Sequence, residues 1–167
     1  MGRVLPVVAE IAGCFPTRTV FTRFKTPVRA TDMPGMWRHY YRRWRDATRG
    51  RLDQGQLQLM PDLARFAPPA AVIDKTRYSA FAESVLLAHL LERQADALIV
   101  TGSETDVCVL AATVLDAVDL GFRVIVVRDA ICSSSNEGHD AILDVYHRRY
   151  SEQIETANAR QILRCWT

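Results

Sequence analysis

The sequence predicts an α/β fold with three layers, in which a Rossmann-like parallel sheet lies between two layers of helices. In the second half of the chain, short apolar segments alternate with helical patterns, which is typical of βαβ units. Those segments are rich in Val and Ile and apolar on both faces, as expected for parallel strands covered on both sides. A length of 167 residues suits one domain, so we treat residues 1–167 as a single unit.

The predicted strands are short apolar runs bounded by turn residues or by helical patterns. The last of them has the weakest pattern. We expect strands at residues 19–22, 71–73, 97–101, 123–127 and 153–157.

Helices are predicted wherever apolar residues recur at helical spacing. The clearest case carries Leu110, Val114 and Val118 on one face, and Gly121 stands where a C-terminal cap is expected. We expect helices at residues 2–14, 37–49, 81–93, 106–120, 137–149 and 159–166.

Composition and charge give little support for a nucleic-acid partner. The net charge is only +2, and one basic cluster, "RHYYRRWR" at Arg38–Arg45, has aromatic residues between its arginines. Such a cluster can bind nucleic acid, or it can form an amphipathic surface helix with its arginines in solvent and its aromatic residues partly buried. We favour the surface helix because no other basic stripe accompanies the cluster.

Cysteine usage and hydropathy indicate a cytoplasmic protein with reduced thiols. The four cysteines form no CxxC pair and no Cys/His cluster at zinc spacing. No apolar run approaches the roughly 18–20 residues that a membrane span needs. Nothing resembles a signal peptide. We therefore expect no membrane partner, no metal and no cofactor.

Cys108 lies where a strand hands over to a helix, in or next to the first helical turn. Unpaired N–H groups and the helix dipole favour a thiolate at such a place, and the same N–H groups can hold an oxyanion. A small buried cysteine is the structural alternative. A phosphate-binding loop is disfavoured because "TGSETD" contains a single glycine.

Four segments together resemble the isochorismatase-like cysteine hydrolases, which include nicotinamidases, N-carbamoylsarcosine amidases, ureide hydrolases and isochorismatases. The resemblance implies the isochorismatase-like hydrolase fold. It also implies hydrolysis of a C–N bond in a small amide or ureide. The segments are "VTGSETDVCVLAATVLDAVDLGFRVIVVRDA" at 100–130, "VIDKTRYSAF" at 72–81, "TVFTRF" at 19–24 and "YSEQIETA" at 150–157.

The resemblance assigns roles to residues of the 72–81 and 100–130 segments. Cys108 matches the nucleophile that forms a thioester, and Lys75 matches the lysine that lowers the pKa of the thiol. A cis peptide is expected between Ser103 and Glu104, with the amides of Glu104 and Cys108 as oxyanion donors. Glu104 departs from the family pattern, in which small apolar residues are usual at this position.

Three further residues are expected to contact substrate: Arg23, Trp37 and Tyr78. Arg23 could meet a substrate carboxylate, and a solvated arginine is the alternative. The segment Thr22–Pro27, "TRFKTP", lacks the Asp-x-His of nicotinamidases, so a bound zinc ion is not expected. The resemblance also implies a homo-oligomer, either a dimer or a tetramer.

One part of the family pattern is missing from the chain. The family carries a catalytic aspartate at the end of its first, central strand, in a motif resembling "LLVIDMQ", and no such stretch is present. We therefore expect an N-terminally truncated sheet. The facing edges of its two neighbours are expected to be exposed, or to pair in another way.

The missing aspartate leaves two hypotheses for function. In the first, Cys108 and Lys75 belong to an amidohydrolase; in the second, the chain is catalytically impaired or non-catalytic because its general base is absent. Isochorismate-type vinyl-ether hydrolysis is disfavoured because isochorismatases generally lack the nucleophilic cysteine.

Overall fold

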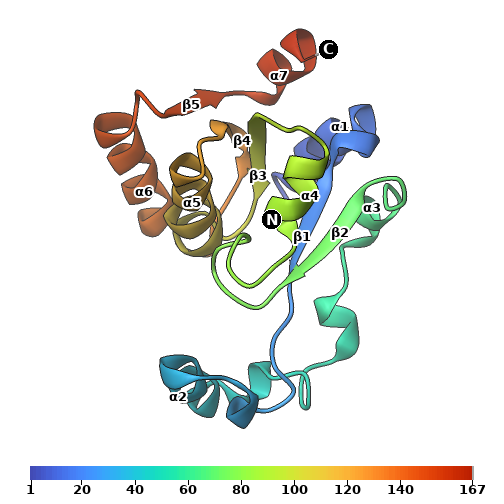
Figure 1. The fold of residues 1–167 in the computed structure, drawn as a ribbon, viewed down its shortest axis with the longest axis vertical. Coiled ribbons are helices and arrows are strands. Elements are labelled where there is room, and N and C mark those ends of the chain that lie inside the picture. The colour runs from blue at the N-terminus through green and yellow to red at the C-terminus, as the bar shows by residue number, and fades with distance from the viewer. Residues whose placement is uncertain (167) are drawn as a thin grey trace.

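Parallel strands form the centre of the molecule, as predicted. The computed structural model describes residues 1–166. β1 (Val20–Phe24) pairs with β2 (Ala71–Lys75) in one sheet. β4 (Arg123–Ile131) pairs with β3 (Ala97–Gly102) and with β5 (Ile154–Ala157) in a second sheet. All three pairings are parallel (Figure 1).

Alternate side chains of the strands pack into two different cores, which explains why the strand sequences are apolar on both faces. In β4, Val124 and Val126 belong to one core, whereas Ile125 and Val127 belong to the other. Val124, Val126 and Val127 are all 0% exposed. The central strand β4 is therefore buried on both sides.

Helices cover both faces, and the three-layer prediction is confirmed (Figure 1). The first core contains α4 (Leu86–Glu92), α5 (Leu115–Asp119) and α6 (Asn136–Arg149). The second contains α1 (Leu5–Cys14), α3 (Pro61–Ala64) and α7 (Ala159–Cys165). No helix within residues 1–166 is both long and apolar enough to cross a bilayer.

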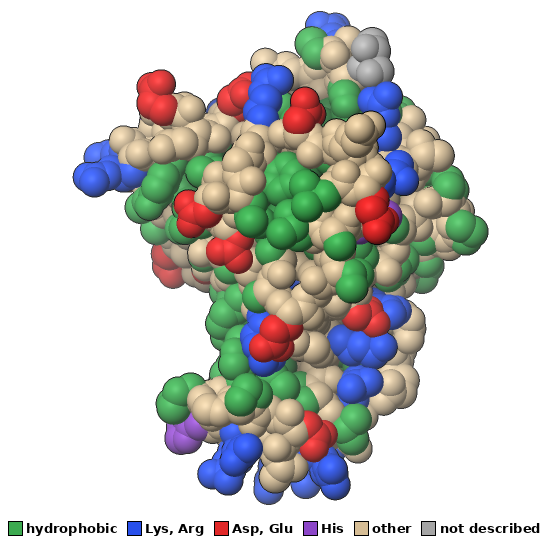
Figure 2. All heavy atoms as spheres, in the orientation of Figure 1, with side chains coloured by type: hydrophobic (Ala, Val, Ile, Leu, Met, Phe, Trp, Pro, Cys, Tyr) green, Lys and Arg blue, Asp and Glu red, His purple; other side chains and the backbone are tan. Residues whose placement is uncertain are grey.

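The basic segment forms α2 (Gly35–Arg43), which lies away from the two sheets (Figure 1). Its cationic side chains gather at this end of the molecule (Figure 2). Tyr41 is 1% exposed and Trp44 is 52% exposed, so only part of the aromatic set is buried. The helix ends at Arg43, earlier than the predicted residue 49, and short 3₁₀ turns follow it. The 3₁₀ turns of the chain are η1 (Pro16–Arg18), η2 (Ala30–Asp32), η3 (Arg45–Ala47) and η4 (Gln54–Leu57).

The helix expected at residues 81–93 begins only at Leu86. Two serines hold the preceding residues in turns, because the Phe81 amide donates to Ser79 Oγ and the Leu86 amide donates to Ser84 Oγ, each at 3.1 Å. Glu83 has a φ of 53°, outside the helical region. Side-chain acceptors therefore replace the first helical turn.

The segment expected to form one α-helix at residues 106–120 is mostly π-helical. Residues Thr105–Val114 form a π-helix, η5, and only α5 is α-helical. The Val109 amide donates to the Glu104 carbonyl at 3.0 Å, five residues back. The Thr113 hydroxyl donates a hydrogen bond to the Cys108 carbonyl at 2.8 Å. Such π-segments are rare and concentrate at functional sites.

β4 runs four residues past the predicted end at 127. The β3–β4 register shifts after Val100, so that Gly102 pairs with Ile131. Gly102 has a φ of +111°, which favours glycine, and its carbonyl accepts the Cys132 amide at 3.1 Å. This bulge gives the chain its turn into η5.

The two sheets do not join. β1 pairs only with β2, and β3 pairs only with β4, so one edge of each strand is left without a ladder partner. Of the two outcomes expected for a sheet without its central strand, the structure therefore adopts the one in which the facing edges stay unpaired. Within residues 1–166, no strand lies between β1 and β3.

The first prediction concerns the core beneath η5. Leu110 is 0% exposed, so Leu110→Ala should lower the free energy of unfolding by about 2–5 kcal/mol through lost burial and a cavity. Leu120 is 44% exposed, so Leu120→Ala should change it by less than about 1 kcal/mol. Urea unfolding followed by circular dichroism measures both variants. Equal effects would contradict the packing described here.

Candidate active site

Cys108 and Lys75 meet at one end of the strands. Lys75 is the last residue of β2, and Cys108 lies in η5, which follows β3. Both line one cavity of about 320 Å³. The carboxyl ends of parallel strands are where ligand sites of such sheets lie.

Lys75 is buried, with 5% of its surface exposed. Its Nζ donates to the Tyr78 carbonyl at 2.5 Å and to the Arg77 carbonyl at 3.2 Å, and lies 5.2 Å from the centre of the Phe24 ring. No carboxylate of residues 1–166 forms an ion pair with it. Burial lowers the pKa of Lys75, and the Cys108 sulfur opposes that effect.

Burial dominates the protonation of Cys108 as well, and raises the pKa of its thiol. The Lys75 ammonium lowers that pKa by its charge and by a hydrogen bond, while Glu104 and Asp106 raise it further. Lys75 therefore acts with the expected sign, but burial outweighs it. The resting form of Cys108 at neutral pH is the thiol.

The turn before Cys108 contains a cis peptide bond between Ser103 and Glu104. The Glu104 carbonyl accepts the amides of Cys108 and Val109, each at 3.0 Å. The Cys108 amide, one of the two expected oxyanion donors, is thus already engaged. The Glu104 amide has no hydrogen-bond partner among the described residues, so it is the donor that this geometry leaves free.

The Glu104 carboxylate points to a serine loop. Its Oε2 accepts the Ser134 amide and hydroxyl, both at 2.7 Å, and the Ser133 hydroxyl at 2.8 Å. Burial would raise the pKa of Glu104, but these hydrogen bonds outweigh it and lower the pKa. Ser133 also donates to Asp106. The carboxylate that departs from the family pattern therefore anchors the turn that precedes the cysteine.

Thr113 is a site residue that the sequence analysis did not single out. Its Oγ1 accepts the Ala80 amide at 3.0 Å and donates to the Cys108 carbonyl at 2.8 Å. It thus ties the turn after Lys75 to the helix that carries the cysteine. A threonine five residues after Cys108, among apolar residues of the helix, was the available signal.

Arg23 binds Asp74 and Gln58, outside the cavity that contains Cys108. Its Nε lies 2.6 Å from Asp74 Oδ1, and its Nη1 donates to Gln58 Oε1 at 2.8 Å. Lys25 Nζ also reaches the same carboxylate at 2.8 Å. Arg23 does not line the cavity that contains Cys108. The structure does not bring this expected substrate contact to the cysteine.

Trp37 and Tyr78 do come together. Their ring centres are 4.7 Å apart, and the Arg77 guanidinium lies 5.6 Å from the centre of the Trp37 ring. The pKa of Tyr78 is raised by burial, then by the charges of Tyr40 and Cys108. Neither Trp37 nor Tyr78 is among the residues that line the cavity containing Cys108. A substrate contact by this aromatic pair stays a prediction.

Potential metal ligands do not gather in the part of the chain that the structure describes. No group of three or more His, Cys, Asp or Glu side chains in residues 1–166 could hold a metal ion. In the segment Thr22–Pro27, the Phe24 ring faces the Lys75 ammonium and Lys25 binds Asp74.

The comparison with known families identifies the family of the chain. The isochorismatase domain matches residues 8–158. The chain belongs to the isochorismatase family. It is 36% identical over 107 residues to the uncharacterized isochorismatase family protein PncA of Bacillus subtilis (strain 168), which covers 64% of this chain and 58% of that protein. It is 33% identical over 100 residues to maleamate amidohydrolase of Pseudomonas putida, covering 59% and 46%. The chain spans about half the length of the curated relatives that it matches.

Solved structures share the fold. An isochorismatase family protein from Desulfovibrio vulgaris gives a TM-score of 0.80 at 20% identity, covering 98% of this chain and 83% of that one. A cysteine hydrolase from Pseudomonas syringae gives 0.79 at 19% identity, covering 98% and 79%. N-carbamoylsarcosine amidase from Thermoplasma acidophilum gives 0.74 at 18% identity, covering 95% and 83%. The isochorismatase-like fold predicted from the sequence is thus confirmed.

The second prediction concerns the thiol. In a background with Cys14, Cys132 and Cys165 changed to Ser, iodoacetamide should alkylate Cys108 with a pH midpoint above that of a free cysteine, because burial raises its pKa. Lys75→Met removes the ammonium that favours the thiolate. The midpoint should therefore move to still higher pH.

A matched control is Lys25→Met, which removes another strand-end lysine, one whose ammonium pairs with Asp74. Its midpoint should stay at the starting value. An unchanged midpoint in Lys75→Met would show that the lysine does not influence Cys108.

The third prediction concerns Asp74. The hydrogen bond from Arg23 lowers the pKa of Asp74 to about 2, with burial opposing and Lys25 assisting. The folded pKa lies below the unfolded value, so this stability is present above about pH 4 and is lost as the pH falls through about 2. Asp74→Asn should lower the free energy of unfolding by about 1 kcal/mol at pH 7, after allowance for solvent screening.

Urea unfolding at pH 7 and pH 3 measures this effect, and the loss caused by Asp74→Asn should shrink at the lower pH. The control is Asp140→Asn, in an exposed carboxylate of α6 that forms no ion pair within residues 1–166. A loss that is independent of pH would rule out the ion pair as its source.

Proposed function

We propose that the chain carries the site of a cysteine amidohydrolase that cleaves a C–N bond of a small amide or ureide. The observation that carries this proposal is the pairing of Cys108 with a buried lysine. Lys75 lies in the same cavity, and its ammonium lowers the pKa of the Cys108 thiol. A buried cation beside a thiol is an arrangement that favours the thiolate as it forms.

The reaction begins with attack of the Cys108 sulfur on the amide carbonyl carbon. The carbonyl oxygen becomes an oxyanion, which the Glu104 amide can receive. The C–N bond then breaks, and the nitrogen leaves as ammonia or an amine after taking up one proton. Water attacks the resulting thioester, the C–S bond breaks, and the products are a carboxylic acid and the Cys108 thiol.

Residues 1–166 place no general base in hydrogen-bond contact with the Cys108 thiol, so proton transfer is the least supported step. The resting cysteine is a thiol, so its proton must pass to a base before or during attack. The nearby carboxylates of Glu104 and Asp106 are hydrogen-bonded to Ser133. Neither forms a hydrogen bond to the thiol. Loss of a general base typically lowers a rate by a factor of about 10²–10⁴.

This deficit supports the alternative proposal, in which the chain is catalytically impaired or non-catalytic. The alternative rests on the unpaired edges of β1 and β3, between which no described strand brings a carboxylate to the site. The two proposals predict the same alkylation of Cys108. They differ in turnover.

The names of similar proteins guide the choice of substrates. Maleamate amidohydrolase and N-carbamoylsarcosine amidase both act on small polar amides or ureides by name, so we propose maleamate and N-carbamoylsarcosine as the first candidates. A substrate contact by the Trp37–Tyr78 pair is part of this proposal, although neither residue lines the cavity that contains Cys108. We further propose a cytoplasmic homo-oligomer that needs no cofactor and binds no nucleic acid.

The fourth prediction tests turnover directly. Ammonia release from maleamate, N-carbamoylsarcosine and nicotinamide is followed by a coupled glutamate dehydrogenase assay. At least one substrate should release ammonia, and Cys108→Ala should abolish that release because it removes the sulfur that forms the thioester. Acid quenching followed by mass spectrometry should detect an acyl group on Cys108.

Cys132→Ala is the matched control, since Cys132 is a second partly buried cysteine near the same turn. Its activity should equal that of the starting protein. Ammonia release that survives Cys108→Ala would contradict the covalent mechanism. No release from any substrate, together with normal alkylation of Cys108, would favour the non-catalytic alternative.

A further inference from the structure

The segment η5, which carries Cys108, differs from an α-helix in the spacing of its hydrogen bonds. The Glu104 carbonyl accepts the Val109 amide, five residues later, and it also accepts the Cys108 amide. An α-helix forms only bonds between residues four apart, and π-helical segments are rare. A π-helix of 10 residues therefore needs interactions that an α-helix at the same place would lose.

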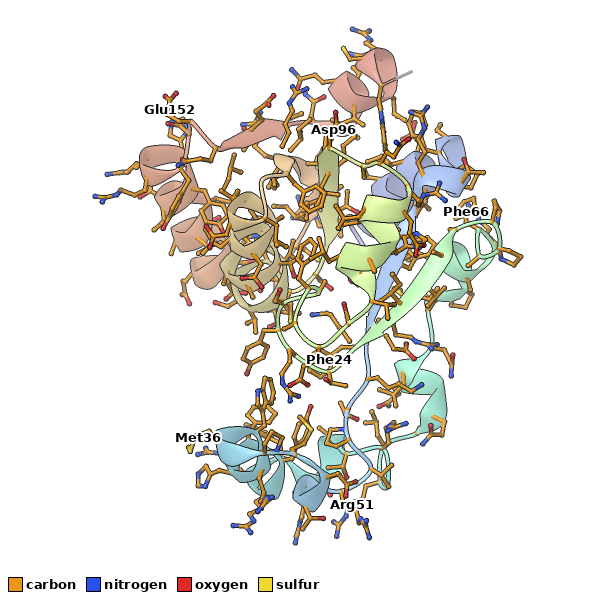
Figure 3. All side chains as sticks on the ribbon, viewed as in Figure 1. Phe24, Met36, Arg51, Phe66, Asp96 and Glu152 are labelled. Atoms are coloured by element: carbon orange, nitrogen blue, oxygen red, sulfur yellow. The ribbon has the colours of Figure 1, made fainter. Side chains whose placement is uncertain are left out.

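The neighbouring helix α6 bonds to η5 at two points. α6 packs beside the helix formed by η5 and α5, with side chains between them (Figure 3). His139 Nδ1 of α6 lies 3.1 Å from Thr105 Oγ1, and the Tyr146 hydroxyl of α6 donates to the Leu110 carbonyl. Thr105 and Leu110 are both 0% exposed. The two contacts therefore lie in the interior, between the helices.

The spacing of these contacts fits a π-helix and not an α-helix. His139 and Tyr146 are seven residues apart, so they lie on one face of α6, about two turns apart. Thr105 and Leu110 are five residues apart, so one π-helical ring places them on the same side of η5. In an α-helix, residues five apart lie about 140° from each other around the axis. Both can face α6 only in the π-helical register.

A third contact comes from within η5. The Thr113 hydroxyl donates to the Cys108 carbonyl, five residues earlier, at 2.8 Å. Threonine hydroxyls in α-helices bond to carbonyls three or four residues earlier. The bond from Thr113 therefore belongs to the π-helical register, and its acceptor is the backbone of the cysteine itself.

The Tyr146 hydroxyl is available as a donor at neutral pH. Burial raises the pKa of Tyr146, and the charge of Tyr150 raises it further, so the hydroxyl stays protonated. Tyr146 is 3% exposed, and its ring packs in the core that contains Leu110. A phenylalanine in its place would keep this packing and lose only the donor.

We propose that Tyr146 and Thr113 are positioning residues, which hold η5 in its π-helical register and so keep Cys108 in the cavity that contains Lys75. Cys108 lies between the two contacts with α6, so the direction of its side chain follows the register. If η5 wound as an α-helix while Leu110 stayed in the core, the residues before Leu110 would rotate about the helix axis. The inference rests on the proposed function only in taking Cys108 and Lys75 as the reacting pair.

The register is tested directly by NMR. In the starting protein, a scalar coupling through the hydrogen bond should join the Val109 amide nitrogen to the Glu104 carbonyl carbon, because this bond is specific to the π-helical register. Tyr146→Phe and Thr113→Val should each reduce the coupling at least about twofold, since each removes one bond that favours the register. Thr113→Ser keeps a hydroxyl and should retain the coupling.

Alkylation of Cys108 tests the consequence, in the background without the other three cysteines. There Lys75→Met should raise the pH midpoint, and Tyr146→Phe or Thr113→Val should reduce that rise to less than about half, because the sulfur has left the ammonium. Tyr150→Phe is the matched control and should leave the rise unchanged. Its ring centre lies 5.5 Å from that of Tyr146, and its hydroxyl forms no hydrogen bond within residues 1–166.

Turnover provides a readout that a loss of stability alone would not move. For a substrate that releases ammonia, kcat of Tyr146→Phe should fall about tenfold while KM stays within about twofold. The reason is that the change displaces the reacting sulfur and not the substrate. Thr113→Ser should keep kcat within about twofold of the starting protein.

A retained coupling in both Tyr146→Phe and Thr113→Val, with an undiminished effect of Lys75→Met, would overturn the proposal. An equal loss in Tyr150→Phe would overturn it as well. Urea unfolding identifies a variant that does not fold, and if Tyr146→Phe is one, the comparison of Thr113→Val with Thr113→Ser decides.

Neither the NMR nor the alkylation experiment needs a substrate, so the two proposals can fail separately. Lost coupling in the variants, with no ammonia release from the starting protein, would reject the hydrolase and keep this inference. Retained coupling in the variants, with normal ammonia release, would do the opposite.

Discussion

The contacts of one buried ammonium hold the site together across a divided sheet. Lys75 ends the smaller sheet and binds the carbonyls of Arg77 and Tyr78, which shapes the turn that follows. The Ala80 amide at the end of that turn reaches Thr113, and Thr113 reaches the Cys108 carbonyl. The two sheets share no ladder between β1 and β3, so this chain of hydrogen bonds and the core around η5 fix the nucleophile relative to the lysine.

Burial and charge act against each other at that site. Burial of Lys75 and Cys108 disfavours the charged form of both groups. It lowers the pKa of the Lys75 ammonium and raises the pKa of the Cys108 thiol. An anion placed beside the lysine would favour its ammonium form. A base that receives the thiol proton would then complete an ion pair of thiolate and ammonium, which is the reactive arrangement.

The fold could be predicted from the pattern of apolar residues, whereas the hydrogen bonds of the site could not be predicted from the sequence. All five strands were predicted, and the pattern was clearest at 97–101 and 123–127, where runs of Val and Ile are apolar on both faces. The π-helical η5 was taken for an α-helix because the spacing of apolar residues alone does not distinguish the two hydrogen-bond patterns. Ser79 and Ser84 delay α4 through side-chain acceptors that an apolar periodicity does not register. Arg23 was taken for a substrate contact because its partner, Asp74, is distant in sequence and becomes its neighbour only through β1–β2 pairing.

The protonated state of Cys108 has a consequence for the chemical durability of the chain. Peroxide and other oxidants react with thiolates far faster than with thiols, and they reach exposed sulfur first. Cys14 and Cys165 are exposed, whereas Cys108 is partly covered and held as the thiol by its surroundings. Oxidative damage therefore begins at the two exposed cysteines at the ends of α1 and α7, before the partly covered Cys108 and Cys132 react.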